Sequence, residues 1–131
     1  MEAEQRFEAG NIAIIVRELH THRGDGLSVD ILAKQPGEDV SVVRLDWFPD
    51  CPHYHYNPRT THGKEIPLDP ALIGDTMSFF LEKIPGSLSN MIQGAGFPEV
   101  AKAMNAGEVN RAMTQVTIAA KAMAKSVVKA A

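Results

Sequence analysis

The sequence predicts an α+β fold in which an N-terminal antiparallel β-meander of four to five strands is covered by C-terminal helices. Two observations lead to this class. Residues 10–68 hold short runs of Val, Ile, Leu and aromatic residues between turn residues, whereas residues 69–131 are rich in Ala, Met and other helix formers. Strands followed by helices are typical of α+β proteins. We expect residues 1–131 to form a single domain, because a chain of 131 residues can build its own core.

Short apolar runs separated by turn residues predict the strands. Such short connections favour antiparallel neighbours. The polar, glycine-containing stretch 20–26 is predicted to be a loop. In the turn at 35–38, Pro36 occupies the second position and Gly37 the third, as turn chemistry favours. The strands are expected at residues 12–19, 27–34, 40–48, 53–57 and 64–68.

The second half is expected to be helical. Asp69 is a suitable N-cap, and Pro70 suits the first helical position. This helix is predicted to end at Pro85, since proline lacks the amide that continues a helix. Further helices are expected over residues 87–93, 98–104 and 108–129.

Two neighbouring strands of the predicted sheet, 40–48 and 53–57, separate their side chains by polarity. If residues 49–52 form the hairpin loop, Asp46 lies opposite His55. Side chains alternate between the two faces of a sheet, so residues two apart share a face. One face is then apolar and aromatic, with Val43, Leu45, Trp47, Tyr54 and Tyr56. The other face is polar, with Arg44, Asp46, His53 and His55.

The polar face predicts a pocket that binds a ligand through these four residues, with Asp46, His53 and His55 as candidate catalytic residues. Histidines two apart on a strand lie about 6.6 Å apart, and both rings can reach one divalent transition metal at about 2.0–2.1 Å. Asp46 could be a further ligand, or could fix the tautomer of an imidazole. His62 and Glu65 follow closely, so the candidate metal ligands are His53, His55 and His62.

Three functions remain open for this pocket. The first is a small binding or accessory protein, the second is a metal-dependent enzyme using His53 and His55, and the third is a structural subunit of an oligomer. A carboxylate-paired histidine could also act as a general base without a metal. A second H-x-H pair, His20 and His22, is expected in a solvated loop. Cys51, the single cysteine, excludes an internal disulfide and is expected in a structural turn.

The last predicted helix, 108–129, carries an apolar stripe with alternating spacings of four and three. Such a heptad seam packs either on the chain's own sheet or on a second copy, and one helix can do both. The sequence therefore predicts a homodimer through this helix. The seam consists of Val109, Met113, Val116, Ala120, Met123, Val127 and Ala130.

Composition limits the partners. The formal net charge of −3 gives no reason to expect nucleic-acid binding, because little would neutralise a row of phosphates. No run approaches about 18 apolar residues, so no membrane span is expected. Residues 1–10 lack the apolar core of a signal peptide, and a cytoplasmic location is the simplest expectation.

Three motifs together resemble a family of small, uncharacterised bacterial proteins with a domain of unknown function. They are R-L-D at 44–46, P-H-Y-H-Y-N-P at 52–58 and I-P-L-D-P at 66–70. The resemblance covers about residues 40–100 and implies no activity. The H-x-H pair also resembles the metal motif of the cupins. Cupins need a double-sheet barrel, however, and this chain turns helical after residue 69, so no cupin residue is carried over.

Overall fold

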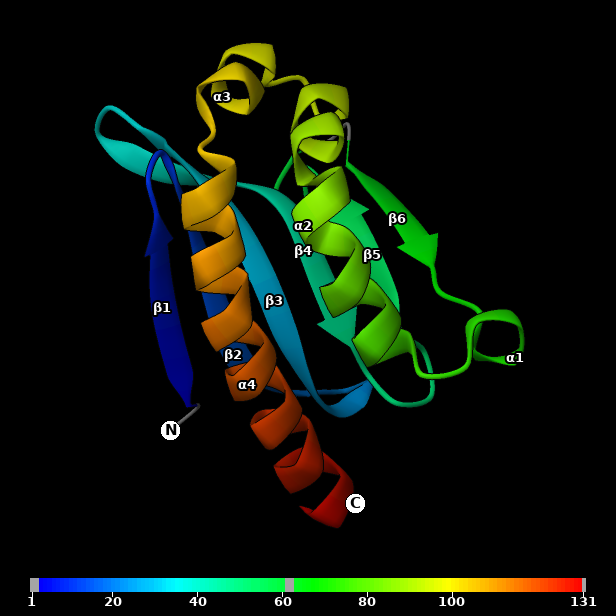
Figure 1. The fold of residues 1–131 in the computed structure, drawn as a ribbon. Coiled ribbons are helices and arrows are strands. Elements are labelled where there is room, and N and C mark those ends of the chain that lie inside the picture. The colour runs from blue at the N-terminus through cyan, green and yellow to red at the C-terminus, as the bar shows by residue number, and fades with distance from the viewer. Residues whose placement is uncertain (1–2, 61–62, 131) are drawn as a thin grey trace.

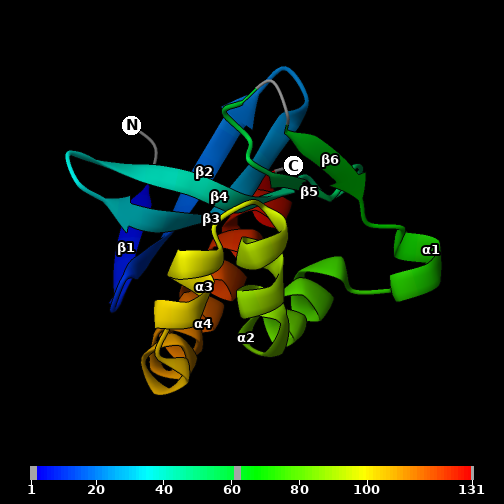
Figure 2. The same ribbon diagram turned by 90° about the horizontal axis from the view of Figure 1, so that it is seen from above.

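The computed structural model describes residues 3–60 and 63–130, and places helices on one face of an antiparallel sheet (Figures 1 and 2). The strands follow one another in chain order: β1 (Glu4–Ala9), β2 (Ile12–Thr21), β3 (Gly24–Gln35), β4 (Glu38–Trp47), β5 (His53–Tyr56) and β6 (Lys64–Pro67). The helices are α1 (Pro70–Ile73), α2 (Thr76–Gly94), α3 (Pro98–Ala103) and α4 (Ala106–Ala130). The predicted α+β class is confirmed, and the sheet has six strands rather than four or five.

The additional strand is β1, at the edge of the sheet. It pairs with β2 from Glu4 opposite Arg17 to Ala9 opposite Ile12. Its sequence, EQRFEA, is largely charged and mostly exposed. Charged residues are common on edge strands, where they discourage pairing with other chains. They also hide the apolar alternation by which the other strands were predicted.

The predicted loop over residues 20–26 is wrong. β2 continues to Thr21 and pairs with Gly24 at the start of β3, so His22 and Arg23 alone form the turn. Gly24 has a φ of +110°, a conformation that other residues rarely adopt. The polar residues that suggested a loop are exposed at the tip of a long hairpin.

The next hairpin turns at Gly37 as predicted, with a φ of +87°. Further along, the ladder between β3 and β4 shifts by one residue at a bulge that leaves Val42 without a partner. This shift places Ser28 opposite Asp46. An unbroken ladder from the same turn would have placed Ser28 opposite Leu45, which faces the helices.

The predicted register between β4 and β5 is wrong by two residues. Asp46 lies opposite His53, and Arg44 lies opposite His55. The connection between the two strands is therefore longer than the expected four residues. Because side chains alternate with a period of two, a shift of two leaves every side chain on its predicted face.

The N-cap at Asp69 is confirmed, since its side chain accepts a hydrogen bond from the backbone N–H of Ala71. The helix that follows, however, is a single turn, and α2 then passes through Pro85. The predicted stop at Pro85 and the separate helix over 87–93 are therefore wrong. Proline inside a helix costs about 3 kcal/mol, but here the apolar stripe continues across it. The buried residues of α2 are Thr76, Met77, Phe80, Leu81, Ile84, Leu88 and Ile92.

The heptad seam of α4 packs inside the chain, against β1, β2, β3 and α2. Six of its seven members are buried in this core: Val109, Met113, Val116, Ala120, Met123 and Val127. The seventh, Ala130, has a side chain outside the part that the structure describes. A partner would therefore have to meet another face of α4, where Ile118 is exposed. The homodimer stays a prediction.

Across residues 3–60 and 63–130, no helix combines the length and the apolar content that crossing a membrane requires.

Candidate functional site

The helix-free face of the sheet carries two adjacent rows of side chains that run across the strands. The strand register aligns the members of each row, and the two rows lie two residues apart along every strand. The first row consists of Glu4, Arg17, Ser28, Asp46 and His53. The second row consists of Arg6, Ile15, Asp30, Arg44, His55 and Glu65. Polar and charged side chains thus gather where β3, β4, β5 and β6 meet.

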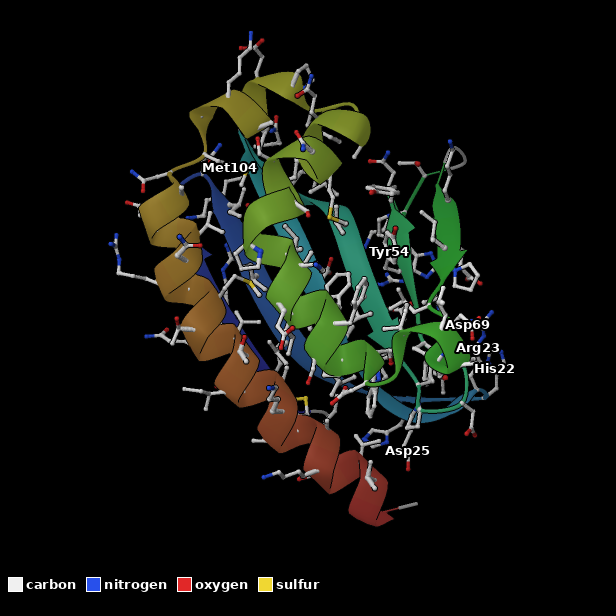
Figure 3. All side chains as sticks on the ribbon, turned by 45° about the vertical axis from the view of Figure 1, so that its right-hand side comes forward. His22, Arg23, Asp25, Tyr54, Asp69 and Met104 are labelled. Atoms are coloured by element: carbon white, nitrogen blue, oxygen red, sulfur yellow. The ribbon has the colours of Figure 1, made fainter. Side chains whose placement is uncertain are left out.

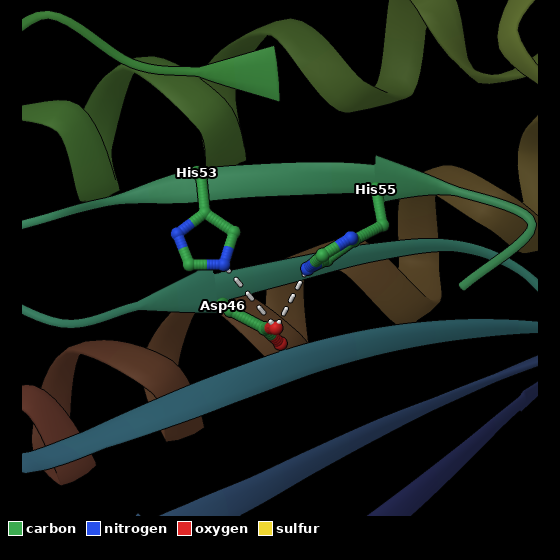
Figure 4. A group of neighbouring side chains, drawn as sticks. All are labelled: Asp46, His53 and His55. Carbon is green, nitrogen blue, oxygen red and sulfur yellow. Dashed lines mark hydrogen bonds and ion pairs between the residues drawn. The ribbon is translucent and has the colours of Figure 1, made fainter. Parts of the chain in front are cut away.

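Asp46, His53 and His55 form the centre of this polar region, and Figure 4 shows the three side chains pointing toward one another. Each side chain has one potential metal-ligand atom, and these three atoms all lie within 4.8 Å of one another. Oδ2 of Asp46 is 3.0 Å from Nε2 of His55 and 3.5 Å from Nε2 of His53. Asp46 and His53 are buried. The cluster therefore brings two imidazoles and a carboxylate together with little competition from solvent.

The orientation of the His53 ring is fixed by its other nitrogen. Nδ1 lies 2.9 Å from the carbonyl oxygen of Cys51, and because a carbonyl can only accept, Nδ1 must donate. The lone pair of a neutral His53 is then on Nε2, the nitrogen that faces Asp46. Such a backbone hydrogen bond commonly sets the tautomer of a metal-binding histidine.

Glu65, on β6, adds a fourth side chain whose oxygen could bind a metal ion. Its Oε1 lies 3.6 Å from Nε2 of His53 and 3.8 Å from Nε2 of His55. The Glu65 side chain is about half exposed, at 48%. Glu65 is thus the most exposed of the four side chains.

Arg44 holds the carboxylate of Asp46 in place. Its Nε donates to Oδ1 at 2.8 Å, and its Nη2 donates to Oδ2 at 3.0 Å. A bidentate pair of this kind fixes the plane of the carboxylate. Oδ2 thus faces the arginine and both histidines at once.

The pKa of His55 lies below its usual value of 6.5. Burial is the main cause, because it disfavours the charged imidazolium, and the nearby charge of Arg44 acts in the same direction. The carboxylate of Asp46 opposes both effects. Burial and the Arg44 charge thus favour the neutral form of His55.

A cavity of about 380 Å³ opens beside the cluster. Its aromatic wall is Phe48, whose ring stacks near His53 with centroids 6.2 Å apart. Gly26 makes room for this wall, since a Cβ there would lie 2.8 Å from Cδ1 of Phe48. The lining residues are Arg17, Leu19, Thr21, His22, Arg23, Ser28, Arg44, Asp46, Phe48, His53, His55 and Glu65.

The tip of the β2–β3 hairpin reaches this cavity. His22 and Arg23, labelled in Figure 3, both contribute to its lining. Nη1 of Arg23 lies 3.5 Å from Nε2 of His53 and 3.9 Å from Oε1 of Glu65. His20 is not part of the lining, and its Nδ1 lies 2.8 Å from Oδ1 of Asp25. Of the second H-x-H pair, only His22 thus belongs to the cavity.

The structure brings together the four residues predicted for the pocket: Arg44, Asp46, His53 and His55. His62, a predicted metal ligand, lies outside the residues that the structure describes. Cys51 is exposed and takes part through its backbone carbonyl rather than its thiol. The sequence reasoning missed Arg17, Arg23 and Ser28. Arg17 and Arg23 could have been found from the tight hairpin, and the face of Ser28 follows from the alternation of β3; the bulge in β4 decides that Asp46 lies opposite it.

The fold and the site define a class: a small α+β protein with a His-His-Asp cluster on the open face of an antiparallel sheet. Two imidazoles and a carboxylate can hold a transition metal, and a histidine paired with a carboxylate can move a proton. The chain belongs to the family described as a domain of unknown function, DUF7700, whose model matches residues 6–120. No curated protein and no solved structure matches the chain.

Proposed function

We propose that this protein binds a divalent transition metal through Asp46, His53 and His55, in an open cavity where the ion can hold a small ligand. One observation carries the proposal: Nε2 of His53, preset by the bond from Nδ1, faces Oδ2 of Asp46 and Nε2 of His55. In this arrangement Nε2 of His55 donates to Oδ2 of Asp46. When that proton lies on Nδ1 instead, all three atoms present lone pairs that a cation would bind.

The spacing of the donor atoms supports a metal of ordinary size. Bonds of about 2.0–2.1 Å at tetrahedral angles separate neighbouring ligand atoms by about 3.3 Å. The distances from Oδ2 of Asp46 to the two imidazoles are 3.0 and 3.5 Å. Those from Oε1 of Glu65 are 3.6 and 3.8 Å. The ligand atoms of Asp46, His53 and His55 all lie within 4.8 Å of one another, so modest movements would bring these three to one ion.

The donor set favours transition metals over magnesium or calcium. Imidazole nitrogen suits zinc, iron, nickel and copper, whereas magnesium and calcium prefer oxygen ligands alone. Two histidines and one carboxylate leave further coordination positions for water or a ligand. This is the arrangement of catalytic rather than structural metal sites.

Elemental analysis by mass spectrometry tests the proposal. Untagged protein is incubated with Zn²⁺, Ni²⁺ or Fe²⁺ under reducing conditions and is then desalted. We expect about one ion per chain in the natural protein, and almost none in the His53→Ala/His55→Ala double variant. His20→Ala is the matched control, since it removes a histidine outside the cavity, and should keep the ion.

The proposal fails if the natural protein retains none of these metals, or if the double variant, still folded by circular dichroism, retains as much as the control. A general base would then be the remaining chemistry of the cluster. The 3.0 Å contact between His55 and Asp46 favours it, because a carboxylate orients an imidazole for proton transfer.

A further inference from the structure

We infer that the cavity binds a small oxyanion, a carboxylate or a phosphate, which contacts Arg17, Arg23 and Ser28 on one side and the metal on the other. The inference rests on the proposed function, because the ion supplies part of the binding, and it names the ligand class of that site. The three residues all line the cavity that opens beside the metal cluster.

Ser28 supplies the observation that first points to a ligand. Its side-chain oxygen is buried and has no hydrogen-bond partner among the residues that the structure describes. An unpaired buried hydroxyl is destabilising, so nearly all such groups are satisfied by protein, water or ligand. Ser28 lies directly between Arg17 and Asp46 in the first row of the sheet. Its hydroxyl is thus at the floor of the cavity, ready to donate to an oxyanion.

Arg17 supplies a positive charge next to Ser28. Its Nε donates to Oε1 of Glu4 at 2.7 Å, and this bond orients the guanidinium. Its two terminal nitrogens make no hydrogen bond with residues 3–60 or 63–130. Planar guanidinium groups recognise carboxylates and phosphates through such terminal N–H groups.

Arg23 supplies a second charge from the hairpin tip. Its contacts with His53 and Glu65 are long, at 3.5 and 3.9 Å. Contacts of this length are weak and are easily exchanged for a charge-assisted hydrogen bond to a ligand. The tip of a two-residue turn can also move toward the cavity more easily than the centre of the sheet.

Charge and size together define the ligand. The three arginines of the lining are matched by Asp46, Glu65 and the Glu4 carboxylate that pairs with Arg17, so a bound divalent ion would supply an excess of two positive charges. Such an excess of positive charge favours an anion. A volume of about 380 Å³ lies at the lower end of the range for small-molecule pockets, so the ligand is a small molecule. Binding is a ligand exchange, in which an oxyanion oxygen replaces water on the metal and no covalent bond is made or broken.

The test uses Co²⁺-loaded protein, because the visible absorption of this ion changes when an anion coordinates it. Inorganic phosphate and malonate are titrated separately, as representatives of the two oxyanion types. We expect at least one of them to change the spectrum saturably. Arg17→Met and Ser28→Ala should each weaken that binding roughly tenfold or more, because each removes a charged or buried hydrogen-bond donor.

Arg6→Met is the matched control. Arg6 lies on β1 and forms surface ion pairs with Glu8 and Asp39, but it does not line the cavity. Its loss should leave anion binding unchanged. Ser28→Ala has a second readout: the variant without ligand should melt at the same temperature as the natural protein or higher, because an unpaired buried hydroxyl is removed.

The outcomes separate the inference from the proposed function. If Co²⁺ binds but neither anion changes the spectrum, the inference is wrong and the metal proposal stands. The inference is also wrong if Arg17→Met and Ser28→Ala bind the anion as tightly as Arg6→Met does. If Co²⁺ fails to bind, the proposed function fails and the inference falls with it. Saturable binding of malonate alone or phosphate alone supports the inference and identifies the oxyanion.

Discussion

The two faces of the sheet have opposite properties, although the same strands build both. Leu45 and Asp46 are neighbours on β4: Leu45 is fully buried under the helices, whereas Asp46 faces the cavity between two histidines. Likewise, Tyr54 packs near Phe80 of α2, while His53 and His55 on either side of it face the cavity. The helix-covered face supplies hydrophobic stabilisation, and the helix-free face holds the polar groups.

Strand alternation separates the stabilising core from the polar cluster in this molecule. Burial of apolar side chains is the main stabilising term, and here it lies largely between the sheet and α2 and α4. The opposite face can therefore carry a polar cluster without weakening that core. Substitutions of neighbouring residues on one strand should thus differ: one lowers the free energy of unfolding, and the next alters binding at the polar cluster.

The largest expected effect is on the helix-covered face. Leu45→Ala should lower the free energy of unfolding by about 2–5 kcal/mol, through lost burial and the cavity left behind. Urea denaturation of metal-free protein measures the loss. The folded fraction should still bind one metal ion per chain. Loss of metal from folded Leu45→Ala protein would break the separation between the two faces.

Gly26→Ala should affect both faces, because the new Cβ would clash with the carbonyl oxygen of Trp47 and lie 2.8 Å from the Phe48 ring. β4 must then shift, at a cost of about 1–3 kcal/mol. We also expect weaker metal binding, since Phe48 stacks beside His53. Gly86→Ala is the control: it has open space in α2 and should be neutral or stabilising. Unchanged stability and metal binding in Gly26→Ala would contradict the close packing of Phe48 between Gly26 and His53.

Glu65→Gln should affect the helix-free face alone. It removes a charge 3.6 and 3.8 Å from the two imidazoles and should weaken metal binding roughly tenfold. Its half-exposed side chain contributes little to the core, so urea stability should hardly change. Calorimetric titration with Zn²⁺ measures the difference, and Glu82→Gln, on the exposed side of α2, is the control. A large drop in stability would place Glu65 among the structural residues instead.

The smallest effect concerns a helix end on the covered face. Asp75 caps α2 by accepting from the backbone N–H of Ser78, and this bond lowers the pKa of its carboxyl below the usual 3.8. The folded protein therefore binds this proton less readily than the unfolded chain does. The stabilisation is complete above about pH 3.8 and is lost as the pH falls through the folded value.

Asp75→Ala should cost about 1 kcal/mol at pH 6, and the difference from the natural protein should shrink below pH 3.8. Asp75→Asn keeps a capping side chain that does not titrate. Any stability advantage of the natural protein over Asp75→Asn at pH 6 should therefore disappear or reverse below pH 3.8. Urea denaturation at pH 6 and at a pH below 3.8 measures these differences in the free energy of unfolding. A cost of Asp75→Ala that does not depend on pH would contradict the assigned role of the carboxylate.

Sequence reasoning succeeded where the signal is local. Strand alternation assigned Asp46, His53 and His55 to one face, and it did so with a register that was wrong by two residues. A register error of an even number of residues leaves each side chain on its predicted face of the sheet, whereas an odd error moves it to the other face. The N-cap at Asp69 and the turn at Gly37 were likewise predicted, because single residues determine them.

Sequence reasoning failed where distant contacts decide the outcome. Pro85 does not end α2, because the helix is held by apolar contacts with the sheet on both sides of the proline. Asp46 lies opposite Ser28 because of the one-residue bulge at Val42, and two consecutive buried valines gave no clear sign of it. The charged edge strand β1 is recognised through its pairing with β2 rather than through its composition.

The most direct measurement is the position of the ion itself. Crystals grown with Zn²⁺ should show one strong anomalous peak within about 2.0–2.3 Å of Nε2 of His53, Nε2 of His55 and Oδ2 of Asp46. That result would confirm that the helix-free face is a metal site held by two strands. A peak elsewhere on the surface, or a direct hydrogen bond still linking His55 to Asp46 with no ion between them, would contradict it.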